Sequence, residues 1–205
     1  DDDWYGADGT GNDAALRGEL ANDDPLKGAA LVRYRGRSQA TRNADAPSMF
    51  DYVPAAQHAA ILAGTSDYDA TDDFHEAFAE MDGTGLTLLV PGAGYRVGEL
   101  VIDGSNFSIS SKGVWLHQWD GLLVNDNIHP IIRIPDTASN IDIGSWRLRG
   151  NLDADALDLP DPAYEGAHGI AVISAKDITI GAVYGEDILG DVIYTYGRDS
   201  SEPEM

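Results

Sequence analysis

Acidic side chains are the residues of this sequence whose spacing could support catalysis. They form two clusters toward the C-terminal end: Asp153, Asp155 and Asp158, and then Glu186, Asp187 and Asp191. Two carboxyl groups, one acting as an acid and the other as a base or nucleophile, carry out glycoside hydrolysis. The candidates for catalysis are Asp155, Asp158 and Asp191, with His168 as a further acid or base. A chain with 35 acidic residues also produces such clusters by chance, so the catalytic residues stay unassigned.

The charge of the chain is its strongest compositional anomaly. The formal net charge is −22, from 35 acidic residues against 13 Lys and Arg. Nucleic-acid binding is not expected, because phosphate contacts need clustered basic side chains. Self-repulsion of this size destabilises a compact fold at low salt, and molar salt screens it. The Asp-rich, Lys-poor composition therefore indicates a halophilic source, the alternative being an acidic virion or extracellular protein selected for solubility.

Several other kinds of site find no support in the sequence. There is no Cys, which excludes disulfides and thiolate metal sites. The acidic stretch from Asp8 to Asp13 has the wrong spacing for a calcium loop, because the terminal bidentate Glu is missing. We expect no metal and no cofactor. No run approaches the roughly 20 apolar residues of a membrane span, so we expect no membrane insertion.

Aromatic residues offer a second kind of chemistry, which is stacking on sugar rings. Trp115, Trp119 and Trp146 are the candidates for such glycan stacking. The competing interpretation is that these side chains pack in the core or in a subunit interface.

The N-terminal stretch contains candidates for contact with a partner. Trp4 and Tyr5 form an aromatic pair in an acidic, Gly-rich arm that we expect to be poorly ordered or ordered by a partner. Arg33, Arg35 and Arg37 alternate, which predicts that they share one face of a strand. They would contact acidic neighbours in another protein, or neutralise the Asp-rich arm of the same chain.

The middle of the chain contains one well-marked helix. Thr71-Asp72-Asp73 is a helix-start signal, and Asp73 with Glu76 predicts an acidic variant of a capping box. An apolar stripe follows at helical spacing, formed by Phe74, Ala77, Phe78 and Met81. Gly83 and Gly85 end the helix.

Strand patterns follow this helix, and a second short helix precedes it. Residues 86–90 predict a buried strand, and residues 95–102 predict further strand interrupted by Gly98. Residues 55–63 follow Pro54 and predict a short helix that Gly64 stops.

Beyond residue 102, short patterns recur. Asn106, Asn140 and Asp177 each open a segment of the form Asn/Asp-apolar-x-Ile, at intervals of 34 and 37 residues. Residues 170–172 and 192–194 form a further pair at an interval of 22. Periods of this length are typical of stacked repeats, here short strands whose alternate side chains share one interior.

These features together resemble a known family. The ordered set of an Asp-rich turn, Thr71-Asp72-Asp73, the short helix, the Gly pair and a strand leading to Val90-Pro91-Gly92 and Tyr95-x-Val97 is similar to the first segment of the pectate-lyase-like right-handed parallel β-helix. Residues 50–65 resemble the variant found in tailspikes of tailed viruses. Residues 26–34, LKGAALVRY, which predict a strand, are similar to the connector that precedes the β-helix in many tailspikes.

The resemblance implies a mainly β fold in two parts. Residues 1–48 would form a small mixed segment for virion attachment, and residues 49–205 the start of the β-helix. Within the second part, residues 49–102 would hold the capping helix and residues 103–205 the rungs. No capping element follows the last rung, so we expect a longer chain or a partner that covers the end.

The implied function is that of a structural virion protein. It would be a tailspike or tail fibre, attached to tail or capsid proteins as a homotrimer, which presents the β-helix to glycan on a halophilic, haloarchaeal host. The alternative is a polysaccharide lyase or glycoside hydrolase acting on host-surface or extracellular glycan, with its catalytic part outside these residues. A third possibility is a host-encoded extracellular glycan-binding protein.

Overall fold

A computed structural model describes residues 33–34, 37–38, 46–118, 129–150, 168–188 and 190–197. The chain divides into two compact units, Asp1–Ala46 and Pro47–Met205. In the first unit, β1 (Arg33–Tyr34) pairs antiparallel with β2 (Arg37–Ser38), with Arg33 opposite Ser38. The prediction that alternating arginines share one strand is therefore wrong for Arg33 and Arg37, because they lie on two antiparallel strands.

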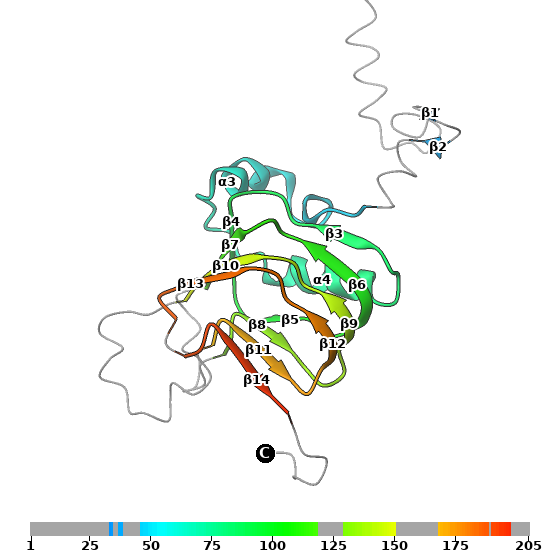
Figure 1. Ribbon diagram of the computed structural model, residues 1–205. Coiled ribbons are helices and arrows are strands. Elements are labelled where there is room, and N and C mark those ends of the chain that lie inside the picture. The colour runs from blue at the N-terminus through cyan, green and yellow to red at the C-terminus, as the bar shows by residue number, and fades with distance from the viewer. Residues whose placement is uncertain are drawn as a thin grey trace, which may run out of the picture. The chain divides into compact units, whose positions relative to one another are not determined.

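The described part of the second unit contains three four-stranded parallel sheets (Figure 1). The first sheet consists of β3 (Thr87–Leu89), β6 (Ser105–Ser110), β9 (Ser139–Asp142) and β12 (Lys176–Thr179). The second sheet consists of β4 (Gly94–Val97), β7 (Val114–Gln118), β10 (Trp146–Arg149) and β13 (Val183–Glu186). The third sheet consists of β5 (Leu100–Val101), β8 (Ile132–Ile134), β11 (Ile170–Ile173) and β14 (Ile193–Tyr196). The chain visits the three sheets in turn, four times, which is compatible with a parallel β-helix.

In inner strands of the sheets, alternate side chains fill a shared interior. In β7, Val114 and Leu116 are buried, while Trp115 and His117 between and after them are only half-buried. In β10, Trp146 and Leu148 are buried, while Arg147 and Arg149 are exposed. Since successive side chains of a strand point to opposite faces, one set lines the interior and the other forms the outer surface of the sheet.

The repeats of the sequence coincide with the stacking of the first sheet. Phe107 of β6 pairs with Ile141 of β9, which pairs in turn with Ile178 of β12. The predicted stacking at intervals of 34 and 37 residues is thus confirmed. For the pair predicted at an interval of 22 the register is wrong by one residue, because Ile170 pairs with Ile193 and not with Val192.

The predicted helix is α4 (Thr71–Met81), which buries Phe74, Ala77, Phe78 and Met81. Phe74 meets Tyr95 of β4 edge to face, with ring centroids 5.2 Å apart, and Phe78 stacks on Phe107 at 6.3 Å. The apolar stripe of α4 therefore packs against interior side chains of the first and second sheets.

The predicted capping box of α4 is wrong. The N-cap position is Ala70, and Asp69 Oδ1 accepts hydrogen bonds from the backbone N–H and the hydroxyl of Thr71. Asp73 instead forms a hydrogen bond with Tyr68, and burial raises the pKa of its carboxyl group. A chain with acids at positions 69, 72 and 73 offers several capping oxygens, and the fold uses the first of them.

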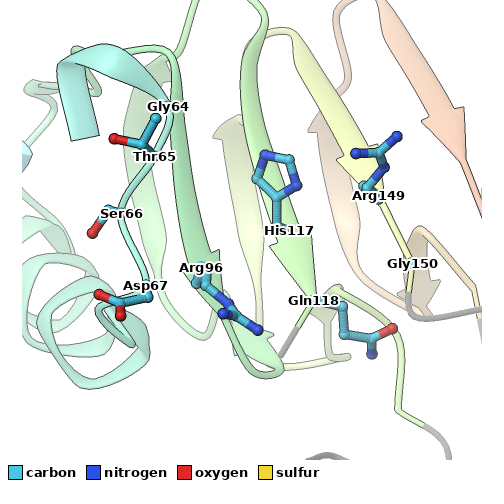
Figure 2. Close-up of a pocket in the computed structure, with 9 residues that line it drawn as sticks. All are labelled: Gly64, Thr65, Ser66, Asp67, Arg96, His117, Gln118, Arg149 and Gly150. Carbon is cyan, nitrogen blue, oxygen red and sulfur yellow. The ribbon is translucent and has the colours of Figure 1, made fainter. Parts of the chain in front are cut away.

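One turn of the chain through the three sheets is called a coil here, and β3, β4 and β5 form the first coil. The segment before α4 lies against this first coil. It contains η2 (Met49–Asp51), η3 (Ala55–Gln57) and α3 (His58–Ala63), and Gly64 ends α3 at φ 70° as predicted. Ser48 forms a parallel bridge with Leu89, and Asp69 forms one with Arg96. Residues 64–67 are thereby held beside β4, at the edge of the second sheet (Figure 2).

Candidate functional site

The outer surface of the second sheet gathers aromatic and basic side chains in two rows. Cross-strand pairing produces the first row, Gly94, Trp115, Arg147 and Tyr184, and the second row, Arg96, His117, Arg149 and Glu186. Adjacent strands lie about 4.8 Å apart, so side chains within a row are neighbours. We call this surface the arginine–tryptophan face.

The arginine–tryptophan face has the buried residues of the same strands behind it. Tyr95, Leu116 and Leu148 alternate with the outward residues and are at most 1% exposed. The hydroxyl of Tyr95 donates to the carbonyl of Pro91 over 2.6 Å, and burial raises its pKa. A rigid, densely packed wall therefore fixes the positions of the outward side chains.

Trp115 lies at the centre of the contacts on this face. The guanidinium carbons of Arg147 and Arg149 lie 5.7 and 5.9 Å from its ring centroid, within the range of a cation–π interaction. Tyr184 meets the indole edge to face at 5.8 Å, and His117 stacks beside it at 5.7 Å. Tyr184 is 54% exposed, so one ring of this aromatic group is open to solvent.

Ion pairs fix the second row. Arg149 Nη2 lies 2.8 Å from Glu186 Oε2, and its Nε lies 3.3 Å from Asp187 Oδ2. The hydroxyl of Tyr184 donates to Glu186 Oε1 over 3.1 Å, which connects the second row to the first. Glu186 and Asp187, proposed from the sequence as part of a catalytic cluster, therefore serve as partners of an arginine.

The face borders two shallow hollows. One has a volume of about 330 Å³ and is lined by the loop from Gly64 to Asp67 and by the strand residues Arg96, His117, Gln118 and Arg149. Arg96, His117 and Arg149 come from the neighbouring strands β4, β7 and β10, and Figure 2 shows their side chains beside that loop. The other hollow, of about 390 Å³, is lined by Ala93, Lys112, Trp115 and Arg147 among others.

Gly94 has no side chain, which leaves room for Trp115 in its own row and for the imidazole of His117 in the second row. A Cβ atom at this position would lie 3.1 Å from His117 Nε2 and 3.2 Å from Trp115 Cβ, tighter than ordinary van der Waals contact. A larger residue in β4 would push the imidazole and the indole aside.

The surroundings of His117 disfavour the charged form of its imidazole. Burial lowers the pKa of its imidazole below the ordinary value of 6.5, and the charges of Arg149 and Arg96 lower it further. Glu186 acts in the opposite direction with a smaller effect. The positive charge of the face therefore comes from the guanidinium groups, and His117 supplies a neutral donor and acceptor.

His168 and Asp191 are the two catalytic candidates among the described residues, and their side chains do not form an acid–base pair. His168 stacks on Tyr194 with ring centroids 4.3 Å apart, and its Nδ1 accepts a hydrogen bond from the backbone N–H of Asp191 over 3.1 Å. The contact uses the backbone of Asp191 and not its carboxylate. The imidazole thus joins two successive coils.

The remaining predicted residues divide into three groups. Trp115 lies on the arginine–tryptophan face, whereas Trp146 is 1% exposed and donates from Nε1 to the carbonyl of Ile143, so its indole is not accessible to a sugar. The third group lies outside the described residues: Trp4, Tyr5, Arg35, Trp119, Asp155 and Asp158. Among the residues that the structure describes, no cluster of His, Asp or Glu could hold a metal ion, and no helix has the length and apolarity to cross a membrane.

The sequence interpretation missed four residues of the face: Arg96, His117, Arg147 and Arg149. A signal was present in the alternating triplets Gly94-x-Arg96, Trp115-x-His117, Arg147-x-Arg149 and Tyr184-x-Glu186, each with an apolar or small residue in the middle. These triplets lie at unequal intervals, and only the pairing of the strands shows that they are neighbours.

Comparison with known proteins adds no family to this description. No family model matches the chain, and neither a curated protein nor a solved structure shows significant similarity to it.

Proposed function

We propose that this protein recognises glycan on a host surface through the arginine–tryptophan face. The observation that carries the proposal is the group of Trp115, Tyr184 and Arg147 on the outer side of a rigid sheet. Aromatic rings stack on the apolar faces of sugars, and flanking polar groups bind the hydroxyls. A shallow, open surface next to two hollows suits an extended polymer better than a small enclosed ligand.

The proposed scaffold is a right-handed parallel β-helix of the pectate-lyase-like kind, with α4 as its N-terminal cap. The three parallel sheets and the apolar contacts of α4 with Tyr95 and Phe107 support this proposal. A solenoid of stacked repeats needs such an element to cover the apolar interior at its end.

The proposed setting is a virion, as a tailspike or tail fibre. The support comes from the resemblance of residues 26–34 to a tailspike connector and of residues 50–102 to the first segment of a tailspike β-helix. In this proposal the protein assembles as a homotrimer, residues 1–48 contact tail or capsid proteins, and the host is a halophile.

Glycan recognition is tested by measuring binding of the purified chain to host envelope polysaccharide, by affinity electrophoresis and calorimetry. Trp115→Ala is expected to weaken binding by about 5-fold or more, because stacking on one ring contributes on the order of 1 kcal/mol. Tyr196→Ala is the matched control, since Tyr196 is an exposed aromatic residue of β14 in the third sheet. Equal binding by wild type and Trp115→Ala would contradict the proposed site.

The same incubation distinguishes binding from cleavage. Release of new reducing ends or of unsaturated uronate would favour the enzymatic alternative over simple recognition. The virion setting is tested separately, by sedimentation and by capture of tail and capsid proteins on the immobilised chain. A stable monomer that captures neither would count against it.

A further inference from the structure

The arginines of the second unit are concentrated on one surface. The chain carries a net charge of −22, yet three of the four arginines in the described part of that unit, Arg96, Arg147 and Arg149, lie on the arginine–tryptophan face. One outward row of the first sheet consists instead of Thr87, Ser108, Asp142 and Thr179, which carry no positive charge. The contrast indicates that the positive charges at this face serve a local purpose.

Arg147 is placed to bind an anionic group. Its side chain is exposed and lies against the Trp115 ring, and no carboxylate among the described residues pairs with it. A guanidinium held beside an aromatic ring binds carboxylate or sulfate with directed N–H donors, while the ring contacts the sugar. The charge of Arg147 is therefore available to a ligand that stacks on Trp115.

Arg149 and its neighbours extend this site along the second row. Glu186 and Asp187 hold the Arg149 guanidinium in one orientation, with Arg96 and His117 following on the adjacent strands. The side chain of Arg149 is still 49% exposed, so it has room for a further oxygen ligand. A polymer lying along β10 would meet first Arg147 and then the hollow that Arg149 lines.

We propose that the arginine–tryptophan face selects an acidic glycan, whose carboxylate or sulfate groups bind Arg147 and Arg149 while a sugar ring stacks on Trp115. This inference rests on the proposed function and specifies its substrate class. The overall negative charge of the chain repels polyanions at long range, so binding depends on these short-range contacts and not on general electrostatic attraction. Long-range repulsion together with these short-range contacts favours a ligand whose negative charges are spaced along a chain of sugar rings.

The test uses polymers that differ in charge and share a backbone. Dextran is compared with dextran sulfate, and methyl-esterified polygalacturonate with the free acid, so that sulfate and carboxylate are examined separately. Binding of the full chain is measured by calorimetry in salt that keeps it folded, as checked by circular dichroism. We expect at least one acidic polymer to bind about 10-fold or more tightly than its neutral counterpart.

Arg147→Gln removes the charge and keeps most of the side chain, and it is expected to reduce binding of the acidic polymer by about 10-fold. Its binding of a neutral polymer should stay within about 2-fold of wild type. Arg133→Gln is the matched control, because Arg133 lies on β8 in the third sheet and pairs with Glu99 over 2.7 Å. Melting curves of both variants establish that the fold is intact.

Each outcome decides the inference. Equal affinity for charged and neutral polymers, with no effect of Arg147→Gln but a loss in Trp115→Ala, would overturn the acidic specificity and leave glycan recognition standing. Failure of every polymer and of host polysaccharide to bind would overturn both. Single-stranded DNA of similar length serves as a further polyanion. If it bound as tightly as the acidic glycan, and through Arg147, the glycan class would be wrong.

Discussion

The side-chain amide of Asn140 donates a hydrogen bond to Oδ1 of Asn106 over 2.7 Å, from one coil to the preceding one. Both residues have positive φ, 53° and 55°, and Asp177 continues the row on β12 at 55°. This left-handed conformation is costly for most L-residues and is tolerated by Asn, Asp and Gly. The same side chains therefore permit a sharp backbone turn and connect successive coils.

Substitution of Asn140 separates these two contributions. Asn140→Ala loses the hydrogen bond and puts a poorly tolerated residue at positive φ, so we expect the free energy of unfolding to fall by about 2–3 kcal/mol. Asn140→Gly keeps the conformation and should cost only about 1 kcal/mol. Urea denaturation of the two variants measures both values. Equal losses would show that the backbone conformation contributes nothing.

The row of Asn106, Asn140 and Asp177 also explains which parts of the fold could be predicted from sequence. The positive-φ turn restricts the residue type at each coil, and the inward Ile or Phe follows at a fixed offset, so Asn106, Asn140 and Asp177 form a visible repeat. The stripe of α4 was predicted for a similar reason, because burial on one side of a helix dictates its spacing.

The functional surface could not be predicted in the same way. The first row of the arginine–tryptophan face runs from position 94 to positions 115, 147 and 184, which are steps of 21, 32 and 37 residues. Connections of different length intervene, and outward side chains have no shared packing requirement that would fix their type. The prediction that Trp146 stacks on glycan is wrong because this residue is buried. An indole whose N–H donates to a backbone carbonyl is as well suited to the core as to a surface, so the residue type alone does not distinguish the two.

Gly144 provides a second test of the coil stacking. A Cβ atom there would lie 2.4 Å from the carbonyl oxygen of Ile109 on the neighbouring coil, and φ is 70°. Gly144→Ala should therefore lower the free energy of unfolding by roughly 3 kcal/mol or more. Gly83→Ala is the control, with φ 72° and open space around the added atom, and should cost only about 1–2 kcal/mol.

Thermal and urea unfolding of these two glycine variants should give clearly different midpoints. Similar losses in both would mean that the close approach of the coils at Gly144 relaxes without cost, and that backbone conformation alone determines the effect.

His117 should make stability depend on pH. Its pKa in the folded protein is lowered by burial, by Arg149 and by Arg96, and raised less by Glu186, while Asp67 lines the same hollow. Because the unfolded chain binds a proton more readily, the contribution of His117 is complete above about pH 6.5 and is lost as the pH falls below that value.

His117→Gln removes this titrating group and keeps a polar side chain. We expect wild type to lose more stability than His117→Gln between about pH 7.5 and about pH 5.5, as measured by urea denaturation at each pH. A direct measurement of the imidazole pKa by NMR should give a value below 6.5. Parallel stability profiles for the two proteins would contradict the lowered pKa.

The net charge of −22 predicts a strong dependence of stability on salt. At low ionic strength the carboxylates repel one another in the compact state more than in the extended chain, whereas molar salt shortens the screening length to about 3 Å. The melting temperature should therefore be much lower in dilute buffer than in molar KCl.

The double variant Asp103→Lys and Asp136→Lys reverses two exposed charges, changing the net value from −22 to −18, and should reduce this difference. Sucrose, which stabilises by exclusion without screening charge, should raise the melting temperature of both proteins alike. A melting curve that is independent of KCl in wild type would show that charge repulsion does not limit the stability of this fold.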